Sequence, residues 1–452
     1  MNDSPRVVIR SKKREEVSPS NFNFNIDQVL LDNLPPGIRT YRSDAWQLFQ
    51  KMPMPGNKDE AWRRTDISRL RLDQFVLPTN NYCLDLPPVP EALLKPLTGQ
   101  EFSGQAVLLP GGCQVQLNDD LANKGVIFSD LKTAEKKYPE YLGQIQGKAV
   151  NPKEGKFAAL TASFSQTGIF LYVPKGVKIL NPIQTLLWAP GVNLAHLAHI
   201  LVWLDEGSEA TFVYETSSPD DNGDALYSGL VEIVTGANAK LRFVELQTFG
   251  RNMWNFSHER ALVDRDASFD WIFGAVGSHL TKNFSEINLV GSGAAGKMSG
   301  FYFADGKQHL DHDTQQNHLA PNTTSDLLFK GALLDESRSV WQGMIYVAPG
   351  AIKTDGYQAN RNLVLSKNAR ADSIPGLEIL ADDVRCTHGA TVGKIDREQV
   401  FYLMARGIPR KEAERLIVEG FFDQIMLRIP FEEIRRRFQE SIEKKMSSYL
   451  VG

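Results

Sequence analysis

A repeat of 28 or 29 residues constrains the fold of this chain more than any other feature of its sequence. The β-rich runs EATFVYE, AKLRFVE, ASFDWIF and GKMSGFYF carry it, with equivalent positions at Ala210, Ala239, Ala267 and Gly296. By subtraction, the successive steps are 29, 28 and 29 residues. Each period holds two strand-like runs, so one period can form one coil of a flattened β-solenoid whose neighbouring coils bury one another's apolar faces. A β-sandwich also contains short strands, but nothing in it fixes such a step.

Local patterns divide the chain into four segments. Residues 1–25 are polar with mixed charge and are expected to be disordered. Residues 26–155 show helical spacing of apolar residues and a proline-rich connector, LDLPPVPEALLKPL. The mainly β solenoid core is expected over residues 156–395, and helices are expected again over residues 396–452. At 50.5 kDa the chain is large enough for several such domains.

Three helices are predicted in the C-terminal segment. Asp396 can cap the first, with Gln399 three residues later, and Gly407 suits its end. Pro409 and Pro430 suit the first turns of the next two helices. The helix after Pro409 has an apolar stripe of Ala413, Leu416, Ile417, Phe421 and Ile425. Such a stripe usually packs on a core, although a helix that caps a solenoid can also dock a partner.

Charge and cysteine content narrow the class of protein. The net charge is −4, the pI is near 6.1, and no long basic run occurs except near the C-terminus, which argues against a nucleic-acid partner. Cys83, Cys113 and Cys386 are widely spaced and form no CxxC pair, as suits a reducing compartment. Neither a signal peptide nor a run of about 20 apolar residues is found. We therefore expect a soluble intracellular protein with no membrane span.

The segment Gly291 to Gly296, GSGAAG, fits the dinucleotide-binding pattern GxGxxG and follows a strand-like run. That fingerprint requires a helix directly afterwards, because the helix N-terminus holds the pyrophosphate. Here KMSGFYF follows and predicts a strand. With Lys297 the letters approach a P-loop, but Met298 stands where a hydroxyl should bind magnesium. A glycine-rich turn between solenoid strands is favoured, and the chain itself is not expected to bind ATP.

The segment HLDHDTQQNH holds the densest set of metal-binding residue types: His309, Asp311, His312, Asp313 and His318. In a strand, His309, Asp311 and Asp313 would share one face while His312 points away, so no three-ligand site closes locally. A metal site and a polar ladder on the solenoid surface are the two alternatives. His196 and His199 lie in an apolar run and are expected to be buried core histidines.

Cys386 and His388 are the best chemical clue, because an extended strand would point both side chains to one face. A thiolate beside an imidazole can bind a soft metal or sulfur. The neighbours Arg385 and His388 are expected to lower the thiol pKa through their positive charge. The alternative is a structural cysteine beside a hydrogen-bonded histidine.

Residues 310–421 closely resemble the SufB/SufD family of iron-sulfur cluster assembly proteins. The resemblance is carried by LDHDTQQNHLAPNTTSDLLFKGALLDESRSVWQG, by NARADSIPGLEILADDVRCTHGATVG and by ARGIPRKEAERLIVEGF. The segment EAWRRTD, from Glu60 to Asp66, is similar to the N-terminal domain of the SufD branch. SufB-like chains read approximately EHEA where this chain has CTHGA, so the resemblance is to the SufD branch.

The resemblance implies a right-handed parallel β-helix with helical N-terminal and C-terminal domains. It also implies a non-catalytic scaffold that pairs with SufB through the β-helices, binds the ABC-type ATPase SufC, and is served indirectly by a cysteine desulfurase. Cys386 and His388 would lie at the SufB interface as ligands of iron or of a transient iron-sulfur cluster, with His388 the better candidate. The SufC contact would involve Arg406, Gly407, Ala413, Leu416, Ile417, Gly420 and Phe421.

Several finer expectations follow from the same resemblance. It allows a reduced flavin on the complex and a homodimer of the chain when it is alone, and it places the protein in a cytoplasm or a plastid stroma. The competing hypothesis from the motifs is an independent nucleotide- or metal-dependent enzyme that uses GSGAAG or HLDHD. Tight nucleotide binding by the isolated chain would favour that enzyme.

Overall fold

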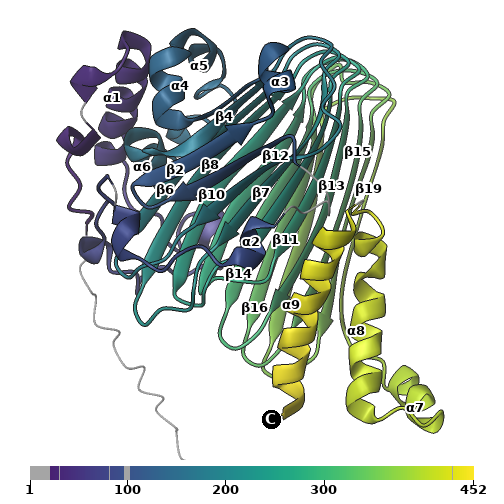
Figure 1. Cartoon of the computed structure of the whole chain (residues 1–452). Coiled ribbons are helices and arrows are strands. Elements are labelled where there is room, and N and C mark those ends of the chain that lie inside the picture. Colours follow the sequence, from purple (N-terminus) through teal and green to yellow (C-terminus); the bar gives the residue numbers. More distant parts are fainter. Residues whose placement is uncertain (1–20, 30, 81, 96–101, 430, 452) are drawn as a thin grey trace, which may run out of the picture.

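The predicted β-solenoid is confirmed in a computed structural model of the chain, which describes residues 21–451 except 30, 81, 96–101 and 430. Two sheets face each other and stack about eight coils along the molecule. In Figure 1 most of the N-terminal helices gather at one end of the solenoid and the C-terminal helices lie toward the other. Residues 1–20, most of the segment expected to be disordered, lie outside the described residues.

Alternate strands belong to alternate sheets, and the coils pair in parallel. The ten-stranded sheet has the spatial order β19 (Arg385–Lys394), β17 (Asp355–Val364), β15 (Thr324–Leu333), β13 (Ala295–Ala304), β11 (Ser268–Ala275), β9 (Lys240–Thr248), β7 (Glu209–Ser217), β5 (Ile183–Trp188), β1 (Gly104–Leu109) and β2 (Gly112–Leu117). The nine-stranded sheet has the order β18 (Arg370–Ile379), β16 (Arg338–Val347), β14 (His309–His318), β12 (Leu280–Leu289), β10 (Met253–Val263), β8 (Ala225–Thr235), β6 (Ala195–Leu204), β4 (Thr167–Val173) and β3 (Ile127–Asp130).

One sequence period does form one coil, but the coils differ slightly in length. Residues paired in one column are Lys240, Ser268, Ala295 and Thr324, which by subtraction are 28, 27 and 29 residues apart. Gly296 pairs with Phe269 and Ala210 pairs with Leu241, so the alignments of Gly296 with Ala267 and of Ala210 with Ala239 that the sequence indicated are each wrong by two residues. The turns between strands vary in length. Spacing counted along the sequence includes these turns, so it does not give the exact pairing of the strands.

Side chains that point between the two sheets form the main core, because successive residues of a strand face opposite sides. Large side chains stack there from coil to coil. The rings of Phe212 and Phe243, which are direct neighbours in β7 and β9, are 6.0 Å apart and nearly parallel. Trp271 continues the column on β11, with its ring 5.6 Å from that of Phe243. Each coil therefore buries its neighbour, as a solenoid requires.

The N-terminal region covers the outer face of the nine-stranded sheet around β6, β8 and β10. Its helices are α1 (Pro36–Lys51), α2 (Glu91–Leu94), α3 (Asp119–Asn123), α4 (Leu131–Lys137), α5 (Pro139–Ile145) and α6 (Lys156–Phe164), with short 3-10 turns at Ile26–Val29, Leu31–Asn33, Glu60–Trp62, Leu72–Gln74, Tyr82–Asp85 and Pro152–Glu154. Arg42 on α1 is buried, and its guanidinium donates to Glu135 on α4 at 2.6 Å and to the Ser165 carbonyl at 2.6 Å. This charged contact joins three parts of the region.

The C-terminal region forms three helices, α7 (Arg397–Ala405), α8 (Arg410–Met426) and α9 (Glu432–Val451). Asp396 caps α7 by accepting a hydrogen bond from the Glu398 amide, and Gly407, with φ +87°, follows its end, as predicted. Figure 1 shows α8 and α9 lying along the solenoid while α7 projects from it.

The apolar stripe of α8 lies close to the predicted position but is rotated on the helix. Its buried residues are Ala413, Val418, Phe422, Ile425 and Met426, and all but Ala413 belong to the apolar cluster on the outer face of the ten-stranded sheet. Leu416 is exposed, so the prediction was wrong at that position, whereas Ile417 and Phe421 are half-buried and Phe421 packs against this cluster. Pro430 lies outside the described residues.

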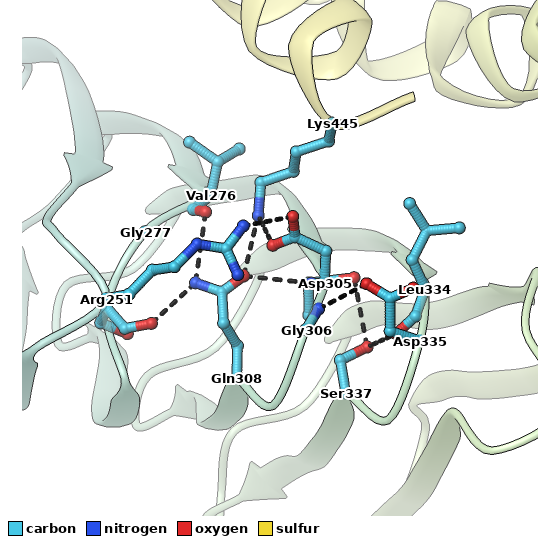
Figure 2. A network of polar contacts seen from close by, with 12 residues as sticks. Arg251, Val276, Gly277, Asp305, Gly306, Gln308, Leu334, Asp335, Ser337 and Lys445 are labelled. Atoms are coloured by element: carbon cyan, nitrogen blue, oxygen red, sulfur yellow. Dashed lines mark hydrogen bonds and ion pairs between the residues drawn. The ribbon is translucent and has the colours of Figure 1, made fainter. Parts of the chain in front are cut away.

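Polar contacts fix α9 on the solenoid, as Figure 2 shows. The ammonium of Lys445 donates to Asp305 Oδ1 at 2.7 Å and to Gln308 Oε1 at 2.8 Å. Asp305 also pairs with Arg251 at 2.5 Å, so one carboxylate ties the helix to two coils. Higher on α9, Phe438 packs against Phe301 at 4.1 Å between ring centroids, and a Cβ on Gly274 would collide with the Phe438 ring.

GSGAAG forms the turn between β12 and β13 and is not followed by a helix, so the predicted glycine-rich turn is confirmed. None of the described helices is long and apolar enough to cross a membrane.

Candidate functional site

Cys386 and His388 lie on β19, the terminal strand of the ten-stranded sheet. They are paired with Gly356 and Gln358 of β17. Cys386 packs against an apolar cluster that includes Ile345, so its side chain points into the space between the sheets. By strand alternation His388 points the same way, which agrees with the shared face expected from the sequence.

The thiol of Cys386 is half-buried beside a histidine that the sequence did not connect with it. A Cβ at Gly356 would lie 3.3 Å from both Cys386 Sγ and His318 Nε2, so the glycine leaves both groups facing the same small space. His318 is buried, and its ring nitrogens are hydrogen-bonded to Thr323 Oγ1 at 2.7 Å and Ser325 Oγ at 2.8 Å. Burial lowers the pKa of His318 to about 4, so its imidazole is neutral at physiological pH.

The expectation that positive neighbours lower the thiol pKa was wrong. Burial has the largest effect on the pKa of Cys386 and raises it. A hydrogen bond with the Gly356 backbone opposes this increase, and the carboxylate of Asp355 adds a smaller increase. Arg385 points to the outer face, where its guanidinium lies 4.0 Å from Asp355. The thiol is therefore mainly protonated near neutral pH and needs a metal or a base to become a thiolate.

His388 lies at an open end of the solenoid. β18 and β19 are the terminal strands of the two sheets at this end, and among the described residues no further strand pairs with either. His388 is exposed, whereas Gln358, its neighbour one coil below, is fully buried and donates to the carbonyls of Gly343 and Gly376. Val392, which faces the same way farther along β19, is 50% exposed. The last coil thus presents a cysteine, a histidine and apolar surface.

A second exposed surface lies on the projecting helix α7 and the start of α8; we call it the α7 surface. Its exposed residues are Phe401, Tyr402, Met404 and Leu416. Phe401 is 72% exposed, and the Arg406 guanidinium lies 5.0 Å from the Tyr402 ring centroid. Large apolar side chains exposed together in this way are typical of a protein-binding site. Of the residues expected to contact an ATPase, Arg406, Gly407, Leu416 and Gly420 are exposed, Ile417 and Phe421 are half-buried, and Ala413 is buried.

Family comparisons identify the chain. The family model described as "SUF system FeS cluster assembly, SufBD core domain" matches residues 188–421, and the model "SufBD protein N-terminal region" matches residues 22–185. The chain belongs to the SufBD family.

Individual SufBD proteins match along most of the chain. An iron-sulfur cluster assembly SufBD family protein of Staphylococcus saprophyticus is 30% identical over 417 residues, covering 88% of this chain and 87% of that protein. A SufBD family protein of Staphylococcus haemolyticus is 29% identical and covers 93% of this chain and 96% of its own length. The iron-sulfur cluster assembly protein SufB of Bacillus subtilis is also 29% identical, over 88% of this chain and 87% of its own length. Identity at this level does not separate SufB from SufD.

Membership of the SufBD family places the protein in the SUF system, where it takes part in iron-sulfur cluster assembly together with other Suf proteins. Within this SufBD fold the segment HLDHD has a structural role. His309, Asp311 and Asp313 face outward, where Thr65 of the N-terminal region bonds to His309 Nε2 at 2.8 Å and also donates to Asp311. Lys282 lies 3.0 Å from each of the two carboxylates.

The groups that pair with these carboxylates distinguish a metal site from a polar ladder in HLDHD. Lys282 already pairs with both carboxylates, and no group of three or more metal-binding side chains comes together among the residues that the structure describes. The polar ladder is thus the better interpretation, although it is buried under the N-terminal region and not on the surface. The independent enzyme loses its support, since GSGAAG is a strand-to-strand turn and HLDHD is an internal ion-pair network.

Proposed function

We propose that this protein is a SufD-type scaffold subunit that pairs with SufB through the open end of its solenoid and binds the ATPase SufC through the α7 surface. The observation that carries the proposal is the position of Cys386 and His388, which face the open end on the last strand. The motif CTHGA at this position supports the SufD branch, because SufB-like chains carry an acidic motif there. The scaffold itself performs no catalysis.

The open end suits a partner with a similar solenoid. The edges of β18 and β19 present backbone groups that a neighbouring strand could pair with, and such edges are normally covered in a native assembly. A second solenoid placed there would enclose His388 and Cys386 between the two proteins. Imidazole and thiolate are suitable ligands for iron, so the enclosed space could hold iron or a nascent cluster as cargo.

His388 is the better of the two candidate ligands. Its side chain is exposed on the last strand, whereas the Cys386 thiol is half-buried and has a raised pKa. Iron binding by Cys386 would require loss of the thiol proton. We propose that His388 binds the iron or nascent cluster directly, and that Cys386 lies beside His318 without being a primary ligand.

The α7 surface suits the ATPase because α7 projects from the solenoid, as Figure 1 shows. Helices α8 and α9 are packed on six strands of the ten-stranded sheet, β7 to β17, by a continuous apolar cluster, so a force applied at α7 would be passed to the solenoid. ATP-driven movement of SufC could in this way change the SufB interface. A reduced flavin on the complex remains compatible with this arrangement and has no assigned residues.

Two matched pairs of variants test the proposal in cells that co-express the tagged chain with SufB and SufC. Val392→Asp should abolish co-purification of SufB, whereas Val290→Asp, at an exposed solenoid turn, should not. Phe401→Asp combined with Leu416→Asp should release SufC but retain SufB, whereas Leu180→Asp should release neither. Retention of SufB by Val392→Asp, or of SufC by the double variant, would contradict the corresponding half of the proposal.

A further inference from the structure

A cavity of about 420 Å³ lies at the end of the solenoid opposite to Cys386. It is formed by the β1–β2 turn, the start of α4 and the beginnings of β4 and β6, and its lining includes Leu77, Asn80, Cys113, Lys132, Phe164 and Leu197. This volume is within the range that small organic ligands occupy in proteins. The proposed partner surfaces do not include it, so it needs an explanation of its own.

One cation lines this cavity. The ammonium of Lys132 is half-buried and donates to the amide oxygen of Asn80 at 2.9 Å. Burial lowers the pKa of Lys132, as is expected for an ammonium that has lost part of its hydration. Asp130 also lines the cavity, but its Oδ1 accepts from the Thr133 amide at 3.0 Å and caps α4. Beside one ammonium, of Lys132, and one carboxylate, of Asp130, a ligand with one negative charge would bind better than a ligand with two.

A free thiol shares the cavity with Lys132. Burial raises the pKa of Cys113 and Asp130 adds to the increase, while the charge of Lys132 acts in the opposite direction. The thiol and the ammonium are thus close enough to influence each other. Because the two groups are close, the reactivity of the Cys113 thiol should change when a ligand binds to Lys132.

A second observation points to a ligand. A small chamber of about 10 Å³ adjoins the cavity and shares Pro78, Thr167 and Leu197 with it. His196 lines the chamber, is only 6% exposed, and its Nε2 has no hydrogen-bond partner among the described residues. Burial lowers the pKa of His196 to about 4, so the ring is neutral. A buried polar atom without a partner is costly, and an atom of a ligand or of water in the chamber would satisfy it.

We propose that this cavity binds a small organic monocarboxylate. The carboxylate pairs with Lys132, the apolar part of the molecule lies on Leu77, Phe164 and Leu197, and its far end reaches toward His196. The single cation favours a monoanion over a phosphate, and the apolar wall favours an organic acid over an inorganic ion. This site does not depend on the proposed SufD role, because it lies at the other end of the solenoid.

Alkylation of the full chain tests the site, because iodoacetate is itself a small carboxylate and iodoacetamide is its neutral analogue. In either reaction the sulfur–carbon bond forms as iodide leaves, and the thiol proton passes to solvent. Cys386 is the internal reference, since burial raises its pKa as it does that of Cys113, but its charged neighbours include an aspartate and no lysine. Cys113 is exposed and Cys386 is half-buried, so the ratio of the two reagents is compared between them and not the absolute rates. Peptide mass spectrometry follows each cysteine separately.

Iodoacetate should react with Cys113 at a rate that saturates with its concentration. The ratio of its rate to that of iodoacetamide should be about tenfold higher at Cys113 than at Cys386. Butyrate should slow alkylation of Cys113 by iodoacetate and leave Cys386 unchanged. Three results with the wild-type chain would each overturn the proposal. They are a Cys113 alkylation rate that rises linearly with iodoacetate, an equal iodoacetate-to-iodoacetamide ratio at both cysteines, and no slowing of Cys113 alkylation by butyrate.

Two variants locate the charge. Lys132→Gln should remove the preference for iodoacetate at Cys113, while Asp130→Asn should increase it, because asparagine keeps the helix cap and loses the negative charge. Both variants should keep the wild-type circular dichroism. If both leave the ratio unchanged, the anion does not bind at Lys132 and the proposal fails.

Discussion

The ammonium of Lys282 lies 3.0 Å from a carboxylate oxygen of Asp311, and both side chains are fully buried. The two residues are direct neighbours on β12 and β14. Asp313 lies at the same distance from Lys282, and Thr65 donates to Asp311 from the N-terminal region. A buried ion-pair cluster of one lysine and two aspartates therefore fastens the N-terminal region to the solenoid, in the segment whose composition suggested a metal site.

Removal of Lys282 should be strongly destabilising, because it leaves two carboxylates unpaired in a buried site. We expect Lys282→Met to lower the free energy of unfolding by about 3–5 kcal/mol. The control is Lys307→Met, which removes an exposed lysine 3.9 Å from Glu336 and should cost less than about 1 kcal/mol. Urea unfolding followed by circular dichroism measures both. Equal losses in the two variants would show that the buried cluster is not what holds the regions together.

Phe422 should anchor α8 to the solenoid. Its ring lies 5.7 Å from that of Phe301 and 6.2 Å from that of Phe303, and it is fully buried. Phe422→Ala should cost about 3–5 kcal/mol and expose α8 to proteases. Leu427→Ala, at a residue of the same helix end that is 81% exposed, should leave both properties unchanged. Limited proteolysis and urea unfolding measure the two effects. If α8 stays resistant to protease in Phe422→Ala, Phe422 is not the anchor of the helix.

Buried neutral histidines should make the protein sensitive to acid. Burial, helped by Arg260 and Lys282, lowers the pKa of His258 to about 3, below the value of about 6.5 in the unfolded chain. Between these values the unfolded state binds more protons, so stability falls as the pH falls below 6.5. By linkage, His258 alone should account for about 2 kcal/mol of loss between pH 7 and pH 5. His258→Gln should lose less stability than the wild type over this interval in urea unfolding; an identical loss would contradict the assignment.

His388→Ala should leave the complex assembled and weaken cluster formation, because the side chain is exposed on the last strand and supports no buried contact. Iron and sulfide analysis of the purified complex measures the effect. Thr391→Ala, on the opposite face of the same strand, is the matched control and should retain wild-type cluster content. If His388→Ala retains the wild-type iron and sulfide content, His388 is not a ligand of the iron or cluster.

Sequence patterns predicted those parts of the structure that depend on local periodicity. The shared face of Cys386 and His388 follows from strand alternation alone, and the cap of α7 follows from Asp396 and its spacing. The position of His318 beside Cys386 could not be predicted, because it depends on how coils 68 residues apart in sequence (386 minus 318) come together across the solenoid interior.

Contacts between distant segments account for the remaining differences. The sequence placed Ala413, Leu416, Ile417, Phe421 and Ile425 on the buried face of α8. The structure buries Ala413 and Ile425 but takes Val418 and Phe422 in place of Leu416, because these side chains are all apolar and only the sheet beneath selects among them. The raised pKa of Cys386 was missed for a similar reason. Arg385 is adjacent in sequence, but it points to the other face of the strand and pairs with Asp355.

Native mass spectrometry of the tagged chain, purified from its own cells, tests the scaffold assignment most directly. We predict an assembly that contains one copy of this chain with SufB and the ATPase SufC. Recovery of the chain only as a monomer or homodimer, under conditions that keep SufB and SufC bound to each other, would contradict the assignment.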